Sequence, residues 1–180
     1  FGTVLGSRIG EMQGVNYMSF VVPGLVMLAI VTSAYSNSSF TFFQSKFFMR
    51  SIDEMLVSPM PPWLIIAGFV AGGVIRGVLV GTLVMLVSLF FTGLHLAVFN
   101  LFIIFVFAIM TAIVFALAGL VNGVYAKSID GINIVPTFVL TPLVYLGGVF
   151  YSVRSLPGWA QLLTYVNPIF YLINGFRFGF

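Results

Sequence analysis

The stretch Val98-Phe-Asn-Leu-Phe-Ile-Ile-Phe-Val-Phe-Ala-Ile-Met-Thr-Ala-Ile-Val-Phe-Ala-Leu-Ala-Gly-Leu-Val121 decides the fold of this chain. It contains no charged residue, and each Leu, Ile, Phe or Val favours membrane insertion by roughly 0.3 to 0.6 kcal/mol. A helix rises about 1.5 Å per residue and the hydrocarbon core of a bilayer is about 30 Å thick, so a run of this length can cross the membrane once. The stretch therefore predicts a transmembrane helix.

The composition extends this prediction to the whole chain. Of the 180 residues, 61% are hydrophobic and only 6% are charged, whereas a soluble domain carries about 25% charged residues. This chain has too little polar surface to enclose its apolar residues in water, so we expect lipid around it. The formal charge of +3 includes no run of Lys and Arg, which argues against a nucleic-acid partner. Without cysteine, the chain forms no disulfide.

The apolar segments predict an all-α polytopic transmembrane helical bundle. The expected spans are about 19–43, 65–91, 98–121 and 134–150, and a further span starts at 168–180. Residues 151–167 are semi-polar and interrupted by Pro157 and Gly158, which is typical of an interfacial or re-entrant hairpin. Because the chain starts without Met and ends in an apolar segment, we interpret it as a fragment that lacks most of its first and last helices.

The candidate chemical residues argue against an enzyme. Neither Lys46 nor Lys127 belongs to a Gly-rich phosphate loop, so we do not expect this chain to hydrolyse ATP. The single histidine, His95, and four dispersed acids do not form a set of metal ligands or catalytic groups. We therefore expect no catalytic, metal or cofactor-binding residue in this chain.

Charges within the predicted spans bear on the energy source. An ion-coupled transporter places an acidic group in the membrane, and none of the four acids lies in a predicted span. Arg76 is the charged residue associated with the second predicted span, 65–91. It either reaches back to the headgroups from an interfacial part of the helix, which we favour, or lies at mid-membrane with a partner or a wet cavity.

The segment Arg50-Ser-Ile-Asp-Glu-Met-Leu-Val-Ser-Pro59 predicts an amphipathic helix. On a helix, Arg50 and Glu54 are four residues apart and share a face beside Asp53. Its apolar strip comprises Ile52, Met55 and Leu56. Such a helix can lie on the membrane surface or dock into a groove on a cytosolic partner, and periodicity leaves both alternatives open.

Several motifs resemble a known family. They are Arg50-Ser-Ile-Asp-Glu-Met-Leu-Val-Ser-Pro-Met-Pro-Pro-Trp63, Gly72-Gly-Val-Ile-Arg-Gly-Val-Leu-Val-Gly81, Pro136-Thr-Phe-Val-Leu-Thr-Pro-Leu-Val-Tyr-Leu-Gly-Gly-Val-Phe-Tyr-Ser152, Leu156-Pro-Gly-Trp159 and Asn167-Pro-Ile169. In order and over residues 1–180, the chain resembles the permeases of type-2 ATP-binding cassette exporters, the ABC-2 type, and is most similar to the YadH-type permeases of bacterial inner membranes.

The resemblance implies a function and a set of site residues. It implies a multi-pass inner-membrane exporter subunit that works as two copies with a separate ATPase, which binds ATP and Mg. Segments 44–62 and 122–133 would meet that ATPase, and 151–167 would lie outside the cytoplasm. The implied coupling residues are Arg50, Asp53, Glu54, Met55, Lys127 and Asp130. The implied residues of the extracytoplasmic hairpin are Arg154, Pro157, Gly158, Trp159 and Pro168.

Orientation and rival functions remain as expectations. Three basic residues fall on each side of the predicted bundle, so charge gives no orientation. Loop parity with the resemblance predicts that Lys46, Arg50, Lys127 and Asp130 face the cytoplasm, and that Arg8, His95 and Arg154 face away. The rivals are an ion-coupled carrier or channel, and a membrane-embedded enzyme acting on lipid. The transported substrate is not legible in the sequence.

Overall fold

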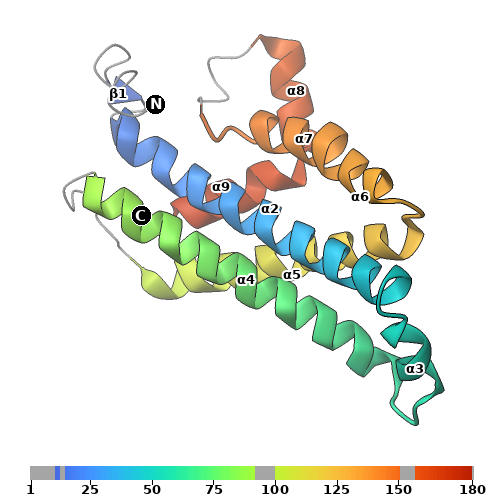
Figure 1. The fold of residues 1–180 in the computed structure, drawn as a ribbon. Helices are drawn as coiled ribbons and strands as arrows, with labels where there is room; N and C mark the ends of the chain where they lie inside the picture. The colour runs from blue at the N-terminus through green and yellow to red at the C-terminus, as the bar shows by residue number, and fades with distance from the viewer. Residues whose placement is uncertain (1–10, 13–14, 92–99, 151–156, 180) are drawn as a thin grey trace. The chain divides into compact units, whose positions relative to one another are not determined.

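The structure is a set of α-helices joined by short links (Figure 1). The computed structural model describes residues 11–12, 15–91, 100–150 and 157–179. Strands in this part of the chain are limited to one antiparallel pair, β1 (Glu11–Met12) and β2 (Val15–Asn16). The helices are α2 (Tyr17–Phe47), α3 (Ser51–Val57), α4 (Pro62–Phe91), α5 (Leu101–Tyr125), α6 (Ile129–Val135), the π-helical turn η1 (Pro136–Leu140), α7 (Thr141–Leu146), α8 (Gly158–Val166) and α9 (Pro168–Arg177). The expected all-α fold class is confirmed.

Four helical segments of the described residues are long and apolar enough to cross a membrane. They are Phe20–Phe47, Pro62–Phe90, Leu101–Tyr125 and Ile129–Leu146. Helix boundaries differ from the expected ones because side chains cap the helices. Asn100 accepts hydrogen bonds from the amides of Phe102 and Ile103, and therefore starts α5 three residues later than expected. Ser128 accepts from the Gly131 amide and starts α6 five residues before the expected 134.

Two prolines lie inside helical segments of the described structure. Helix α2 begins at Tyr17, so Pro23 lies inside it and removes an internal hydrogen bond. At Pro136 the chain continues through η1 into α7. The span ends near Gly148, whose positive φ of 76° suits a residue without a Cβ.

The chain divides into two compact units that the long helices share. The first unit comprises Phe1–Ala29, Gly81–Ala108 and Thr141–Phe180, and the second comprises Ile30–Val80 and Ile109–Leu140. Helix α2 is the most enclosed span, because 61% of its most apolar 18 residues are buried, against 17% for α4 and 33% for α5. Among the described residues, α2 therefore contributes more buried side chains than any other helix, and α4 and α5 present more of their apolar side chains to the surroundings.

In the second unit, glycines let helices approach the second half of α2. A Cβ on Gly77 of α4 would lie 2.9 Å from the Ala34 Cβ, and one on Gly123 of α5 would lie 2.7 Å from the Ser39 carbonyl oxygen. Both distances are shorter than a normal contact, so only glycine fits there. Figure 1 shows this part of α2 alongside the first half of α4.

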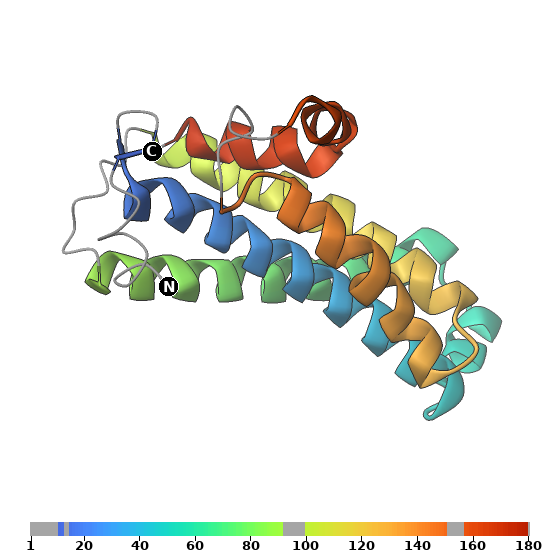
Figure 2. The same cartoon turned by 90° about the horizontal axis from the view of Figure 1, so that it is seen from above.

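In the first unit, α9 lies alongside the first turns of α5 (Figure 2). The amide of Asn100 donates to the Gly179 carbonyl over 3.1 Å, which ties the two helix ends together. The Asn167 side chain connects α9 with its neighbours: its oxygen accepts from the Ile169 amide, and its nitrogen donates to the Leu143 carbonyl of α7. Asn167 is therefore the N-cap of α9.

Candidate functional site

The short helix α3 carries three of the expected coupling residues. Asp53 and Glu54 lie in its first turn and are exposed, where carboxylates favour the positive end of the helix dipole. Ile52 is buried, Met55 is half-buried, and Leu56 is 63% exposed. The predicted apolar strip is therefore only partly covered, and α3 presents acidic and apolar side chains together.

Arg50 departs from the sequence-based expectation. The predicted helix face that Arg50 shares with Glu54 requires Arg50 to be helical, but α3 begins at Ser51. Arg50 has a φ of 51°, in the left-handed region that reverses the chain after α2. That turn includes two amides, of Phe48 and Met49, that donate to the Gln44 carbonyl. The prediction that Arg50 lies on a helix face with Glu54 is wrong, because Arg50 lies in the turn before α3.

The second expected coupling segment is shorter than predicted. Residues 122–133 were expected to form a link, but α5 continues to Tyr125 and α6 starts at Ile129, which leaves 126–128 between the helices. Lys127 lies in this link and Asp130 in the first turn of α6, and both side chains are exposed. Asp130 thus sits at a helix start, where its charge is favourable.

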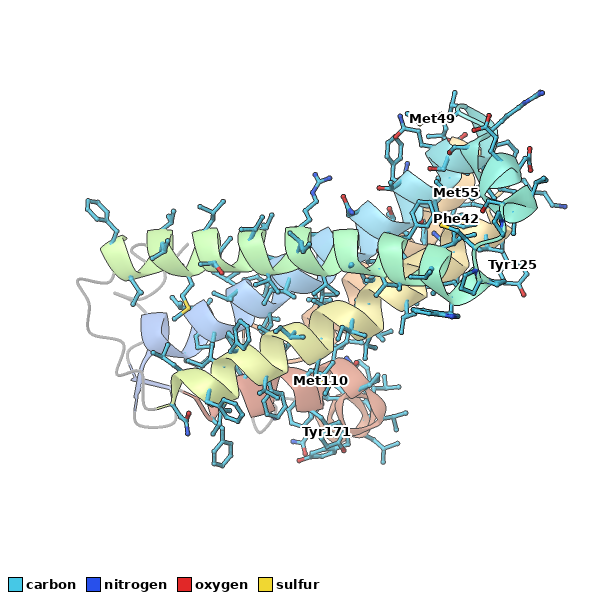
Figure 3. All side chains as sticks on the ribbon, turned by 90° about the horizontal axis from the view of Figure 1, so that it is seen from below. Phe42, Met49, Met55, Met110, Tyr125 and Tyr171 are labelled. Carbon is cyan, nitrogen blue, oxygen red and sulfur yellow. The ribbon has the colours of Figure 1, made fainter. Side chains whose placement is uncertain are left out.

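Contacts within the second unit hold both segments at one end of the bundle. Lys46, in the last turn of α2, donates to the Val124 carbonyl at the end of α5 over 2.9 Å. Phe43, Ala126 and Ile132 form a buried cluster that joins α2, the link and α6. Figure 3 shows Met49, Met55, Phe42 and Tyr125 gathered at this end. The exposed acids of α3 and the α5–α6 link therefore belong to the same end of the second unit.

The expected hairpin is described only in part. Arg154 lies outside the described residues, as do Arg8 and His95. Pro157 precedes α8, Gly158 is its first residue, and Pro168 occupies the first turn of α9. Trp159 is 71% exposed, and α8 buries Ala160 and Thr164 on its opposite face. This helix is amphipathic, with the one-sided apolar exposure of a helix that lies at a membrane interface.

A second site, absent from the sequence-based list, surrounds Arg76. A cavity of about 510 Å³ opens here within the second unit. Its polar lining comprises Thr32, Ser33, Tyr35, Ser36, Arg76 and Asn133. The Arg76 guanidinium donates to the Asn37 side-chain oxygen over 3.1 Å. Arg76 thus lies within a candidate span, has a hydrogen-bond partner and lines a cavity. These are the features of the alternative that the sequence analysis did not favour.

A sequence signal for this cavity exists. The second half of the first span is unusually polar for a membrane helix, with Thr32-Ser33 followed by Ser36-Asn37-Ser38-Ser39. Residues 33 and 37 are four apart, so the spacing places Ser33 and Asn37 on one helix face. Periodicity does not reveal that Arg76 of α4 lies near this face of α2, because the pairing of the two helices depends on tertiary packing.

Comparison with known proteins identifies the family. A model of the family described as ABC-2 type transporter matches residues 1–180. The chain belongs to the ABC-2 type transporter family. Inner membrane transport permease YadH of Escherichia coli strain K12 is 53% identical over 180 residues, which are 100% of this chain and 69% of that protein. Nodulation protein J of Rhizobium leguminosarum bv. viciae is 27% identical over 176 residues, which are 98% of this chain and 67% of that protein. No solved structure matches the chain.

The membership confirms the family that the sequence motifs indicated. This ABC-2 chain is a transport permease domain and an integral membrane protein with transmembrane helices. Its expected site residues that the structure describes fall at three places: the end that carries α3 and the α5–α6 link, the start of α8, and the start of α9, where Pro168 lies.

Proposed function

We propose that this permease is the membrane subunit of an ATP-driven exporter in a bacterial inner membrane, with two copies forming the pathway. A separate ATPase supplies the energy and binds ATP and Mg, as is general for its family. This chain performs no chemistry of its own. The observation that carries the proposal is α3, an exposed acidic and apolar helix joined by a short turn to the most buried span, α2.

The geometry explains how a partner could act on the pathway. A protein that binds α3 makes contact with Asp53, Glu54 and the exposed Leu56. Any displacement of α3 reaches α2 through the Phe48–Arg50 turn, and α2 packs on α4 and α5 through glycine contacts. Closely packed helices shift as units rather than deform, so movement at α3 is passed into the membrane. Lys127 and Asp130 widen the same docking surface.

A charge reversal at Glu54 tests the proposal. We expect Glu54→Arg to reduce retention of the ATPase and transport-coupled ATP hydrolysis, because it places like charge against a complementary basic surface. The measurement is a pull-down of the neighbouring ATPase with the full-length permease, followed by hydrolysis in reconstituted vesicles. Glu11→Arg is the matched control, since it makes the same reversal on the side predicted to face away from the ATPase. Unchanged retention and hydrolysis in Glu54→Arg would reduce α3 to an ordinary surface helix.

The proposal assigns α8 and the preceding residues 151–157 to the outer side of the membrane. The support is the amphipathic character of α8, with Trp159 and Leu162 exposed and Thr164 buried. A re-entrant hairpin returns to the side from which it started, so α9 would begin on the outer side as well. A phosphatase fusion after Asn167 should then be active in the periplasm, and activity restricted to a cytoplasmic reporter would contradict the assignment.

A further inference from the structure

The position of Arg76 is unusual for a charged residue in a membrane helix. The candidate span of α4 is Pro62–Phe90, and Arg76 is its middle residue, with residues 62–75 before it and 77–90 after it. At about 1.5 Å per residue, each helix end is about 21 Å away. A guanidinium at this depth needs hydrogen-bonding groups or water around it, because the hydrocarbon core solvates charge poorly.

The surroundings of Arg76 leave its charge uncompensated. Its hydrogen-bond partner among the described residues is the Asn37 side chain, which is neutral. No carboxylate of the described residues pairs with it. A guanidinium has five N–H donors, so one hydrogen bond leaves most of its donor capacity for another ligand. The Arg76 side chain is exposed and lines the cavity, so it places an unpaired positive charge at the cavity wall.

Neighbouring groups add polar atoms to the same cavity. Ser33 and Ser36 contribute hydroxyls from α2, and Asn133 contributes an amide from α6. Tyr35 also lines the cavity, and its buried hydroxyl has no hydrogen-bond partner among the described residues. These groups surround the charge with donors from two further elements.

The remaining wall of the cavity is apolar. Phe40, Ile132 and Pro136 line it together with the polar groups. The volume of about 510 Å³ lies within the range of about 300 to 1,000 Å³ that small-molecule sites occupy. Arg binds phosphate and carboxylate groups through two parallel hydrogen bonds. The lining thus combines a recognition site for an anion with space for an apolar group.

We propose that this cavity binds the anionic head group, a phosphate or a carboxylate, of an amphiphilic molecule. Arg76 holds the charge, the hydroxyls of α2 and the Asn133 amide orient it, and the apolar wall contacts the attached chain. Asn37 positions the guanidinium through its side-chain oxygen. The inference goes beyond the proposed coupling to an ATPase and does not depend on it. The head group can belong to a membrane lipid or to a molecule taken up from water.

A cysteine reporter tests this site, because the chain contains no cysteine. The full-length protein, with any cysteine outside residues 1–180 replaced, would carry Ser36→Cys and be reconstituted in phosphatidylcholine vesicles without ATPase or ATP. We expect decyl phosphate to slow the reaction of this thiol with N-ethylmaleimide. Decyltrimethylammonium has the same chain length with the opposite charge and should not slow it. Val57→Cys, which replaces an 88% exposed residue outside the cavity, reports any general effect of the amphiphile.

A lipid arm distinguishes the two sources of the head group. Vesicles that contain phosphatidylglycerol should protect the Ser36→Cys thiol without added amphiphile if a lipid occupies the site. Protection only by decyl phosphate would indicate a ligand taken up from water. Either result supports an anionic head-group site, and neither depends on ATP turnover.

Substitutions at Arg76 give the decisive comparison. Arg76→Gln should raise the decyl phosphate concentration for half-protection about tenfold or more, because a hydrogen bond to a charged group is lost. Arg76→Lys keeps the positive charge but loses the two parallel N–H donors of the guanidinium. It should raise the concentration for half-protection less than Arg76→Gln does. Leu79→Gln introduces the same side chain at an exposed position of α4 outside the lining and should change nothing. Equal protection by the cation, undiminished protection in Arg76→Gln, or an unreactive Ser36→Cys thiol in all vesicles would overturn the proposal.

Discussion

Single polar side chains hold the helix ends of this permease together. The Arg177 guanidinium, at the end of α9, donates to the carbonyl oxygens of Gly148 and Val149 over 2.8 and 3.3 Å. It also lies 3.9 Å from the centre of the Phe20 ring. These two carbonyls follow α7 and accept their hydrogen bonds from the Arg177 side chain. Arg177 therefore substitutes for the helix that ends there.

Replacing Arg177 should destabilise the protein. Arg177→Ala leaves the Gly148 and Val149 carbonyls without their donor, which costs about 2 kcal/mol in the free energy of unfolding. We expect a lower Tm in thermal unfolding of the detergent-solubilised full-length protein. Arg50→Ala is the control, since it truncates the same residue type at an exposed position. An equal Tm for the two variants would show that the Arg177 contacts add nothing to stability.

Asn122 performs a similar role in the second unit. Pro136 has no amide, so it cannot donate to the Ile132 carbonyl four residues earlier. The Asn122 side-chain nitrogen of α5 donates to that carbonyl over 3.0 Å and to the Ser39 hydroxyl of α2 over 3.2 Å. One amide group thus completes the broken helix and joins it to two others.

Removing the Asn122 side-chain amide should lower the free energy of unfolding more than removing that of Asn133. Asn122→Ala leaves the Ile132 carbonyl unsatisfied and should lower the free energy of unfolding by about 1 to 3 kcal/mol. Asn133→Ala loses a bond to Ile129 within its own helix, at an exposed position, and should cost less. Denaturant unfolding followed by circular dichroism compares them. A smaller loss in Asn122→Ala than in Asn133→Ala would contradict this account.

At the scale of elements, the spacing of helices depends on where glycine faces a neighbour. Gly123 of α5 contacts the backbone of α2 near Ser39, whereas Gly68 of α4 has no atom within 4 Å of the Cβ it lacks. The two residues have the same helix propensity, yet their surroundings are opposite. They therefore allow packing to be separated from propensity.

The two glycine substitutions should change stability in opposite directions. Gly68→Ala should raise the free energy of unfolding by about 0.5 to 1 kcal/mol, because alanine favours the helix. Gly123→Ala gains the same propensity but places a Cβ 2.7 Å from the Ser39 oxygen, so we expect a net loss of about 1 kcal/mol or more. Thermal unfolding of both variants in one detergent measures the difference. A gain in Gly123→Ala would mean that α5 can move away from α2 freely.

The spans could be predicted from the sequence because long apolar runs are visible without knowledge of packing. The boundaries could not, since they depend on caps such as Asn100 and Ser128 and on the continuation of the helix through Pro136. Arg76 was recognised as unusual, but its cavity requires α2, α4 and α6 to meet. The helix α3 was predicted, although Arg50 lies in the turn before it rather than on its face.

At the scale of the whole molecule, the orientation in the membrane remains a prediction. Lys127 and Arg154 are expected on opposite sides, so Arg154→Cys should react with a membrane-impermeant thiol reagent in intact cells and Lys127→Cys should not. The physical basis is loop parity, because each span reverses the side of the chain. Permeabilised cells are the control, in which both positions should react. The reverse pattern in intact cells would invert the proposed orientation and place α3 outside.

The length of α4 has a consequence for the lipid around the protein. Its 30 residues extend about 45 Å, whereas the hydrocarbon core is about 30 Å thick. Hydrophobic mismatch of this size is relieved by tilting the helix, by thickening the adjacent bilayer, or by letting one end emerge into the headgroups. Each response shifts the depth of every residue on α4. Bilayer thickness therefore sets how deeply the charge of Arg76 lies, so membranes of different lipid composition would tune the same cavity to different depths.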